Sequence, residues 1–227
     1  RSIVLDRNVS RSPASETSVI WWTPYGSRWT VRSTVQPVAP LPAIADELIT
    51  VAEVQRHIKG ASSPEDEDIP RWIRAARGVV ERATGLVLIP QTFDLFLDVF
   101  GAYAGWLDLP HGPITSVTEI VSIAEDGTTE TEIDTTTYWL DGFTRPARLG
   151  FSTVPSWTGV RPRDPIRRPY VAGYAEPELV PAELVQAMLL VVADFAAHRG
   201  DEREPVEGTL PMNVAGLLSP FTMPGVV

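Results

Sequence analysis

The sequence predicts an α+β protein: a helical bundle that carries a small inserted antiparallel β region and an extended N-terminal arm. Two observations support this prediction. Apolar residues recur at helical spacing within residues 46–90 and again in residues 176–227, whereas residues 91–175 show short Val, Ile and Thr runs between Gly and Pro turns. The bundle is expected to contain two N-terminal helices, one long apolar helix and a short C-terminal helix.

Residues 1–45 form the predicted arm, because their Ser, Thr, Pro and Arg content and the Pro spacing favour extended chain over helix. A disordered terminus is the alternative for such a composition. Several bulky aromatic residues would, however, be poorly placed in water. We expect the arm to link neighbouring subunits, by strand addition or by packing, through Trp21, Trp22, Tyr25 and Trp29.

Residues 46–90 predict a pair of helices. The first should begin at Thr50, because Thr50 and Glu53 have the spacing of a capping box. The second is expected between Ser63 as N-cap and Gly85, with the acidic residues 65–68 at the positive end of the helix dipole. Its core-facing stripe should consist of Ile69, Trp72, Ile73, Ala76, Val79, Val80 and Ala83.

Residues 91–175 form the predicted β region, and residues 176–227 return to helix. A strand is expected over 92–98, and a hairpin is indicated by the turn at 125–127. The helix that begins near Pro181 is apolar nearly all round, so it should lie at the centre of the bundle or against a partner.

Composition excludes several classes of function. The chain has no Cys and three His without the spacing of metal ligands, and it lacks the minimal motifs of serine hydrolases, P-loop nucleotidases and Rossmann enzymes. We therefore predict no enzyme, no catalytic residue, no cofactor and no metal, although a glycosidase-type carboxylate pair stays open because its separation depends on the fold. The chain also has no apolar run long enough to span a membrane.

Charge argues against tight binding of nucleic acid. The 29 acidic and 19 basic residues give a net charge of −10, which repels phosphate over most of the surface. A cluster of arginines in a Pro-rich loop could still contact phosphate or an acidic partner, with a solvated loop as the alternative. These residues are Arg161, Arg163, Arg167 and Arg168.

An ordered set of segments follows the two capped helices. It consists of 85–92 (GLVLIPQT), 109–117 (LPHGPITSV), 170–174 (YVAGY) and 180–187 (VPAELVQA). Over residues 48–220, this set resembles the head–tail connector, or adaptor, family of tailed phages and gene transfer agents. The arm lies outside the resemblance.

The resemblance implies a ring of twelve identical subunits in the virion neck, assembled in the host cytoplasm. The ring would sit beneath the portal protein and extend the DNA channel, so that genomic DNA passes through the lumen without specific binding. Its other face would receive a stopper or tail-completion protein. The family has no catalytic residues to transfer to this sequence.

The resemblance further implies that the C-terminal segment docks on the portal, which agrees with its surplus of apolar residues: Met212, Val214, Leu217, Leu218 and Phe221. The alternative function is a carbohydrate- or receptor-binding module in which exposed Trp106, Trp139 and Trp157 of the β region stack on sugar rings.

Overall fold

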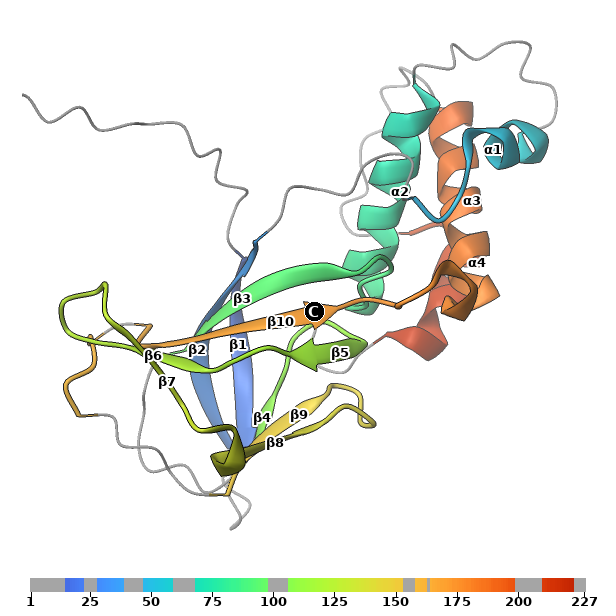
Figure 1. The fold of residues 1–227 in the computed structure, drawn as a ribbon. Coiled ribbons are helices and arrows are strands. Elements are labelled where there is room, and N and C mark those ends of the chain that lie inside the picture. Colours follow the sequence, from blue (N-terminus) through green and yellow to red (C-terminus); the bar gives the residue numbers. More distant parts are fainter. Residues whose placement is uncertain are drawn as a thin grey trace, which may run out of the picture.

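The computed structural model of the protein describes residues 15–22, 28–38, 47–58, 68–97, 106–152, 158–162, 164–198 and 210–222. Its helices and its strands separate into a helical lobe and a β lobe that lie side by side (Figure 1). Each lobe has its own cluster of buried apolar side chains. None of the helices in these ranges is long and apolar enough to cross a lipid bilayer.

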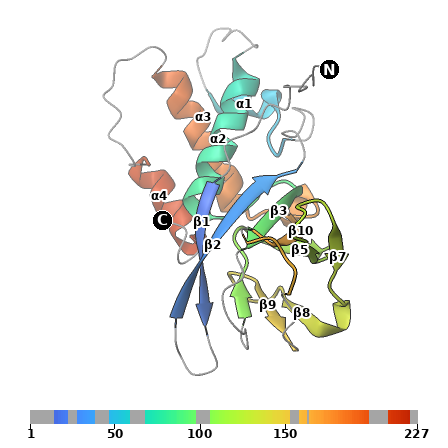
Figure 2. The ribbon, with the colours of Figure 1, turned by 90° about the vertical axis from the view of Figure 1, so that its left-hand side faces the viewer.

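Four α-helices of the described ranges form the helical lobe (Figure 2): α1 (Val51–His57), α2 (Ile69–Thr84), α3 (Ala182–Ala197) and α4 (Met212–Leu218). Short 3-10 helices at Pro177–Leu179 and Ser219–Phe221 precede α3 and follow α4. All four α-helices contribute to one core, which includes Val54, Trp72, Ile73, Ala76, Val80, Leu184, Met188, Val192, Val214 and Leu218.

Local signals in the sequence set the ends of two helices. The predicted capping box begins α1: the Glu53 N–H donates to Thr50 Oγ1 at 3.2 Å, and the Thr50 N–H donates to Glu53 Oε2 at 2.7 Å. Gly85 ends α2 in the left-handed conformation, with φ of 73°, as predicted. The described part of α2 begins at Ile69, and the expected N-cap Ser63 lies outside the described residues.

Ten strands within the described ranges form one antiparallel sheet in the order β7-β6-β10-β3-β2-β1-β4-β9-β8, with β5 also beside β10. The strands are β1 (Ser15–Trp22), β2 (Arg28–Pro37), β3 (Gln91–Leu97), β4 (Trp106–Asp108), β5 (Ile114–Val117), β6 (Val121–Ile123), β7 (Glu130–Glu132), β8 (Tyr138–Asp141), β9 (Arg148–Phe151) and β10 (Ile166–Ala172). A 3-10 helix at Thr135–Thr137 connects β7 and β8.

The segment after α2 joins the two cores. Leu86 and Leu88 pack into the helical core, whereas Val87 between them packs into the β core. The Val87 N–H donates to the Gly112 carbonyl at 2.6 Å. Nearby, Gly173 has φ of 126°, and a Cβ there would lie 2.7 Å from the Ile89 carbonyl carbon, so only glycine permits this close approach of backbones.

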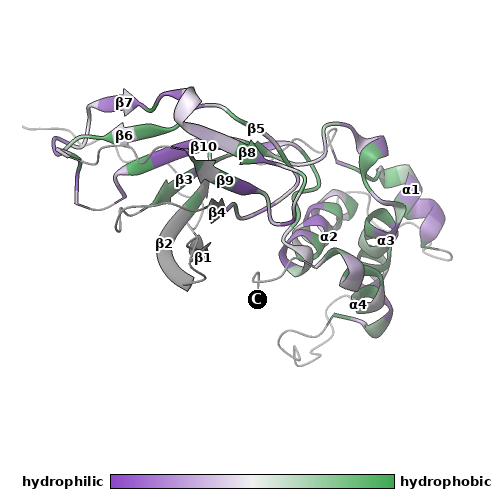
Figure 3. Cartoon of the chain, turned by 90° about the horizontal axis from the view of Figure 1, so that it is seen from below, coloured by the Kyte–Doolittle hydropathy of each residue, from purple (hydrophilic) through white to green (hydrophobic). Residues whose placement is uncertain are grey.

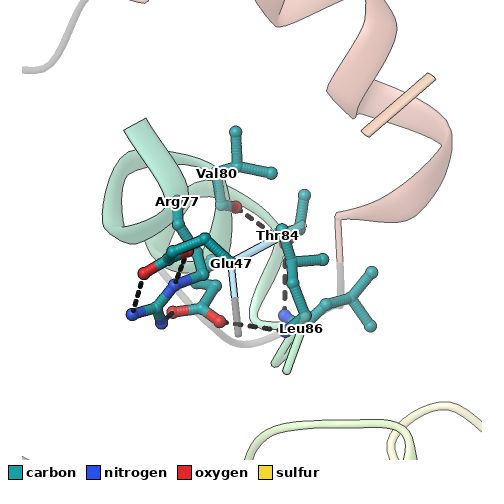
Figure 4. Close-up of polar contacts among 7 residues, drawn as sticks. Glu47, Arg77, Val80, Thr84 and Leu86 are labelled. Carbon is teal, nitrogen blue, oxygen red and sulfur yellow. Dashed lines mark hydrogen bonds and ion pairs between the residues drawn. The ribbon is translucent and has the colours of Figure 1, made fainter. Parts of the chain in front are cut away.

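A buried ion network fixes α2 to the segment before α1 (Figure 4). Arg77 Nε lies 3.0 Å from Glu47 Oε2, and its Nη1 lies 3.0 Å from Glu81 Oε2. Glu81 also accepts from the Leu88 N–H at 2.9 Å, which ties the network to the junction of the lobes. Burial raises the pKa of the Glu81 carboxyl, against the opposing effect of Arg77.

The predicted fold class is wrong in two respects. The β region is not a small insertion in a helical bundle, because β1 and β2 from the predicted arm extend the sheet to ten strands within the described residues. There is also no long apolar helix among them: α3 has 16 residues, as α2 does, and its side chains Val185 and Leu189 are only partly buried. The apolar pattern predicts that α3 lies at the centre of the bundle or against a partner, whereas within this chain one side of the helix lies in the core and Val185, Leu189 and Leu190 are only partly buried.

Candidate functional site

The five residues expected to dock on the portal divide into an inward and an outward set. Val214 and Leu218 are 0% and 2% exposed and belong to the helical core. Leu217 and Phe221 are partly buried against that core. Met212, at the start of α4, is 91% exposed. The inner side chains thus hold α4 on the lobe, and Met212 presents an apolar side chain to solvent.

The aromatic residues of the predicted arm lie on or near the β1–β2 hairpin. Trp21 of β1 pairs with Trp29 of β2 across the hairpin, and Trp22 pairs with Trp106 of β4. Tyr25 lies outside the described residues. Both strands of the hairpin join the sheet of their own chain: β2 pairs with β3, and β1 pairs with β4. The linking of subunits by these aromatic side chains remains a prediction.

The β8–β9 hairpin presents two aromatic side chains at the end of the sheet. Trp139 of β8 is 49% exposed and lies over Gly150 of β9, where a Cβ would come within 2.3 Å of the indole ring. Phe143, in the connecting loop, is fully exposed. The loop is ordered by hydrogen bonds: Asp141 Oδ1 accepts from the Phe143 N–H at 3.0 Å. We call the connecting loop, residues 142–147 with Phe143 near its start, the finger.

A groove of about 310 Å³ lies between α1 and α3 of the helical lobe. Three apolar side chains and three ionisable ones line it: Ile49, Val185 and Leu189, and Glu53, Arg56 and His57. The capping box fixes Glu53, and its hydrogen bonds with Thr50 lower the pKa of that carboxyl. We call this feature the α1–α3 groove.

The arginines of the predicted basic loop make contacts within the chain. Arg161 donates to the Asp164 carbonyl and lies over the Phe96 ring at 5.9 Å. Arg167 bridges Asp94 at 3.2 Å and Glu130 at 3.1 Å. Arg167 is thus paired with two carboxylates, and Arg161 is engaged with a backbone carbonyl and a phenyl ring. Arg163 lies outside the described residues.

Arg168 is buried in the interior of the β lobe. Along β10, alternate residues face the core, and this pattern places Arg168 between Ile166 and Tyr170. Its side chain is fully buried, and none of its guanidinium nitrogens has a hydrogen-bond partner among the described residues. Burial lowers the pKa of Arg168 to about 9, which leaves it charged at pH 7.

Two histidines contact neighbouring side chains of the chain. His198 lies 3.1 Å from Asp194 at the end of α3. His111 stacks on Phe93 with ring centroids 5.1 Å apart, and burial lowers its pKa. Within the described ranges, no three His, Asp or Glu side chains gather closely enough to hold a metal ion.

Comparison of the structure with solved structures shows a shared fold. A chain of the structure described as "Virion of native gene transfer agent (GTA) particle" is 23% identical, with a TM-score of 0.64 over 83% of this chain and 95% of that chain. A chain from "Neck of empty GTA particle computed with C6 symmetry" is 23% identical, with a TM-score of 0.65 over 83% of this chain and 95% of that chain. A chain from "Neck of native GTA particle computed with C12 symmetry" is 22% identical, with a TM-score of 0.63 over 83% of this chain and 94% of that chain. The sequence matches no protein-family model and no curated protein.

Neither the finger nor the groove is indicated by the sequence. A single Phe between Gly142 and Pro146 gives no periodic signal, so Phe143 could not be distinguished from a residue that folds back onto the sheet. The groove combines residues of α1 and α3 that are more than 120 positions apart. Arg168 did carry a signal, because it alternates with Ile166, Tyr170 and Ala172 along a strand.

Proposed function

We propose that the protein is a structural head–tail adaptor that forms a ring of identical subunits in the neck of a tailed phage or a gene transfer agent. The observation that carries this proposal is the fold shared with chains of gene transfer agent particles over about 95% of their length. Two of those structures are described as necks, with C6 and C12 symmetry. A twelvefold ring of this chain follows by analogy.

The portal-facing surface of this adaptor would be built on α4. Val214 and Leu218 anchor the helix in the core, so the contact to the portal would come from Met212 with the half-buried Leu217 and Phe221. A few apolar anchors that fill a groove supply most of the affinity in such contacts. The opposite face of the ring would receive the stopper or tail-completion protein.

The charge of the chain suits a conduit for DNA. A net charge of −10 disfavours the counterion release that drives tight DNA binding, and the arginines Arg161 and Arg167 are engaged with acceptors of their own chain. Genomic DNA would therefore pass the lumen of the ring without being held. The function requires no catalytic residue and no cofactor.

Portal binding by α4 can be tested with two matched exposed residues. Met212→Asp should weaken binding to the portal protein of the same genome by at least about tenfold, because it places a charge at an apolar contact. Leu179→Asp, at a residue 59% exposed and distant in sequence from α4, should bind as the wild type does. Equal binding by wild type and Met212→Asp would reject α4 as the docking element.

The carbohydrate-binding alternative rests on Trp139, because the side chain of Trp106 and all of Trp157 lie outside what the structure describes. The indole of Trp139 already covers Gly150, which gives it a packing role in the hairpin. Glycan-array binding that is lost in Trp139→Ala, together with absence of portal binding, would favour the alternative over the adaptor.

A further inference from the structure

The solvent-facing side of α2 carries arginines and no carboxylate. Arg71, Arg74 and Arg82 are all exposed, and at 3.6 residues per turn they lie within about a quarter of the helix circumference. Between them, this side holds only the small residues Ala75 and Gly78. We call the surface made of these five residues the basic face of α2. In a chain with a net charge of −10, it is a local excess of positive charge.

Two arginines of the basic face lack a carboxylate partner. Arg71 bridges Asp68 at 2.6 Å, whereas Arg74 and Arg82 have no ion pair among the described residues. Arg82 Nη1 lies 3.5 Å from the position that a Cβ would take on Gly78, so the guanidinium folds back along the face toward Arg74. Like charges on one face repel each other, and an acidic partner would remove this cost.

The β6–β7 hairpin and its flanking residues have the opposite character. Residues 118–137 contain six acidic residues and no basic one. Three of the six already accept hydrogen bonds or an ion pair within the chain: Asp126, Glu130 and Asp134. Glu125 in the turn and Glu132 of β7 are exposed, and their carboxylates have no partner among the described residues. These two carboxylates are free to meet a cation.

The free charges of the two surfaces have matching spacings. Arg74 and Arg82 are eight positions apart in α2, which is about 12 Å along the helix at 1.5 Å per residue. Glu132 lies opposite Val121 in the hairpin, and Glu125 follows Val121 by four positions, which is about 13 Å at 3.3 Å per residue. Two ion pairs can therefore form together when the hairpin lies along α2.

The basic face and the hairpin lie in different lobes. In two views at right angles, β6 and β7 lie at the end of the β lobe that is away from the helical lobe, to which α2 belongs (Figure 1, Figure 3). Ion pairs between the two surfaces therefore join two molecules. A contact between different surfaces of identical chains is heterologous, and its repetition closes a ring when the rotation between neighbours permits.

The net charge gives a physical reason for this contact in a ring. Neighbouring subunits that each carry −10 repel one another. A contact that sets the basic face of one subunit against an acidic surface of the next offsets this repulsion and fixes the orientation of the neighbours. The same net charge makes nucleic acid the less favoured occupant of the basic face, because most of the surface repels phosphate.

We propose that the basic face of α2 in one subunit binds the β6–β7 hairpin of the next subunit. Four side chains form the ion pairs: Arg74 and Arg82 of the face, and Glu125 and Glu132 of the hairpin. The occupant of the basic face is thus a second copy of this chain. The proposal rests on the ring of the proposed function, which it deepens by naming the two surfaces of the subunit contact.

Charge reversal on each surface, followed by mixing, tests this contact. The two variants are Arg74→Glu/Arg82→Glu and Glu125→Arg/Glu132→Arg, and sedimentation velocity measures association with the portal protein absent and present. Each variant alone should associate at least about tenfold more weakly than the wild type, because like charges meet at the contact. A 1:1 mixture should recover the wild-type association, since every contact between the two variants pairs opposite charges.

Reversals at other exposed residues control for the change in net charge. The control variants are Arg56→Glu/Arg145→Glu and Glu176→Arg/Glu178→Arg, which shift the net charge by the same amounts. Their effect should be small beside that of the paired surfaces, and thermal melts should show that all four variants are folded. Wild-type association should weaken at about 1 M salt, where the Debye length is about 3 Å, whereas repulsion alone would make it stronger there.

The outcomes separate this contact from the adaptor role. Loss of association without recovery in the mixture, or an equal loss in the control variants, would overturn the contact. Rings on the portal that the reversals leave unchanged would overturn it and leave the adaptor role intact. If only the retention of duplex DNA by such rings were lost, the basic face would belong to nucleic acid.

Recovery in the mixture without any portal binding would support the contact and contradict the adaptor role. A wild-type chain that neither self-associates nor binds the portal would contradict both.

Discussion

Each lobe buries an arginine, and the two arginines differ in whether their charge is paired. In the helical lobe, Arg77 is 4% exposed and contacts the carboxylates of Glu47 and Glu81. In the β lobe, Arg168 is fully buried without a hydrogen-bond partner among the described residues. A buried charge that is paired adds specificity to a fold, whereas an unpaired one costs free energy. The ion network therefore secures the helical lobe, and Arg168 is a cost to the β lobe.

The largest effect should follow from breaking the paired arginine. Arg77→Met leaves the buried Glu47 carboxylate and the part-buried Glu81 carboxylate without their cation, and it should lower the free energy of unfolding by about 3–5 kcal/mol. Arg74→Met, on the exposed side of the same helix, is the control and should change it by less than about 0.5 kcal/mol. Urea denaturation measures both. A similar small loss in the two variants would contradict the importance of the network.

Equivalent cavities in the two cores test whether the lobes unfold together. Leu184→Ala in the helical core and Leu95→Ala in the β core both truncate side chains that are 0% exposed, so each should cost about 2–5 kcal/mol. Since Leu86 and Leu88 pack into the helical core and the adjacent Val87 packs into the β core, we expect each variant to accelerate native-state hydrogen exchange in both lobes. Acceleration confined to the mutated lobe would show that the lobes are independent.

Removing the unpaired arginine should stabilise the protein. Arg168→Met should raise the free energy of unfolding at pH 7 by about 1–4 kcal/mol, because an apolar side chain replaces an unpaired buried charge. The folded-state pKa of Arg168, about 9, lies below the ordinary value of 12.5. As the pH rises above about 9, the wild-type side chain loses its charge and with it the free-energy cost of burying that charge. The difference in unfolding free energy between variant and wild type should therefore shrink above about pH 9. Arg168→Lys keeps the charge and should give no gain. Destabilisation by Arg168→Met would show that Arg168 has an acceptor in solution.

The smallest effect is expected at an exposed turn of the β lobe. Hydrogen bonds from Thr129 and Thr128 lower the pKa of Asp126 to about 2 from 3.8. Its contribution is therefore present above about pH 3.8 and is lost as the pH falls through about 2. Asp126→Ala should lower Tm slightly at pH 5, and the difference from wild type should disappear near pH 2. A difference in Tm independent of pH would contradict the role of the carboxylate.

The helical lobe was more predictable than the β lobe because its signals are local. The Thr50–Glu53 capping box and the stop at Gly85 depend on residues a few positions apart, and both are confirmed. The pairing of β2 with β3, which places Val35 opposite Leu95, joins residues 60 positions apart. Composition indicated that residues 1–45 are extended, but it could not indicate which strand they would join.

The candidate surfaces were predictable in part. The apolar surplus of α4 is evident in the sequence, yet Val214 and Leu218 turn inward and Met212 outward, and only the packing of the helix decides this. Phe143 becomes notable only because the structure leaves its side chain fully exposed. Exposure of a single side chain is a property of the tertiary structure, so sequence periodicity does not report it.

Electron microscopy tests most directly whether this chain forms a ring on a portal. The purified protein should be imaged with and without the portal protein of its own genome, with Met212→Asp as the matched variant. We expect a ring of subunits stacked on the portal, with α4 at the contact, and loss of the stacked ring in the variant. Portal particles without any added density at saturating protein would contradict it.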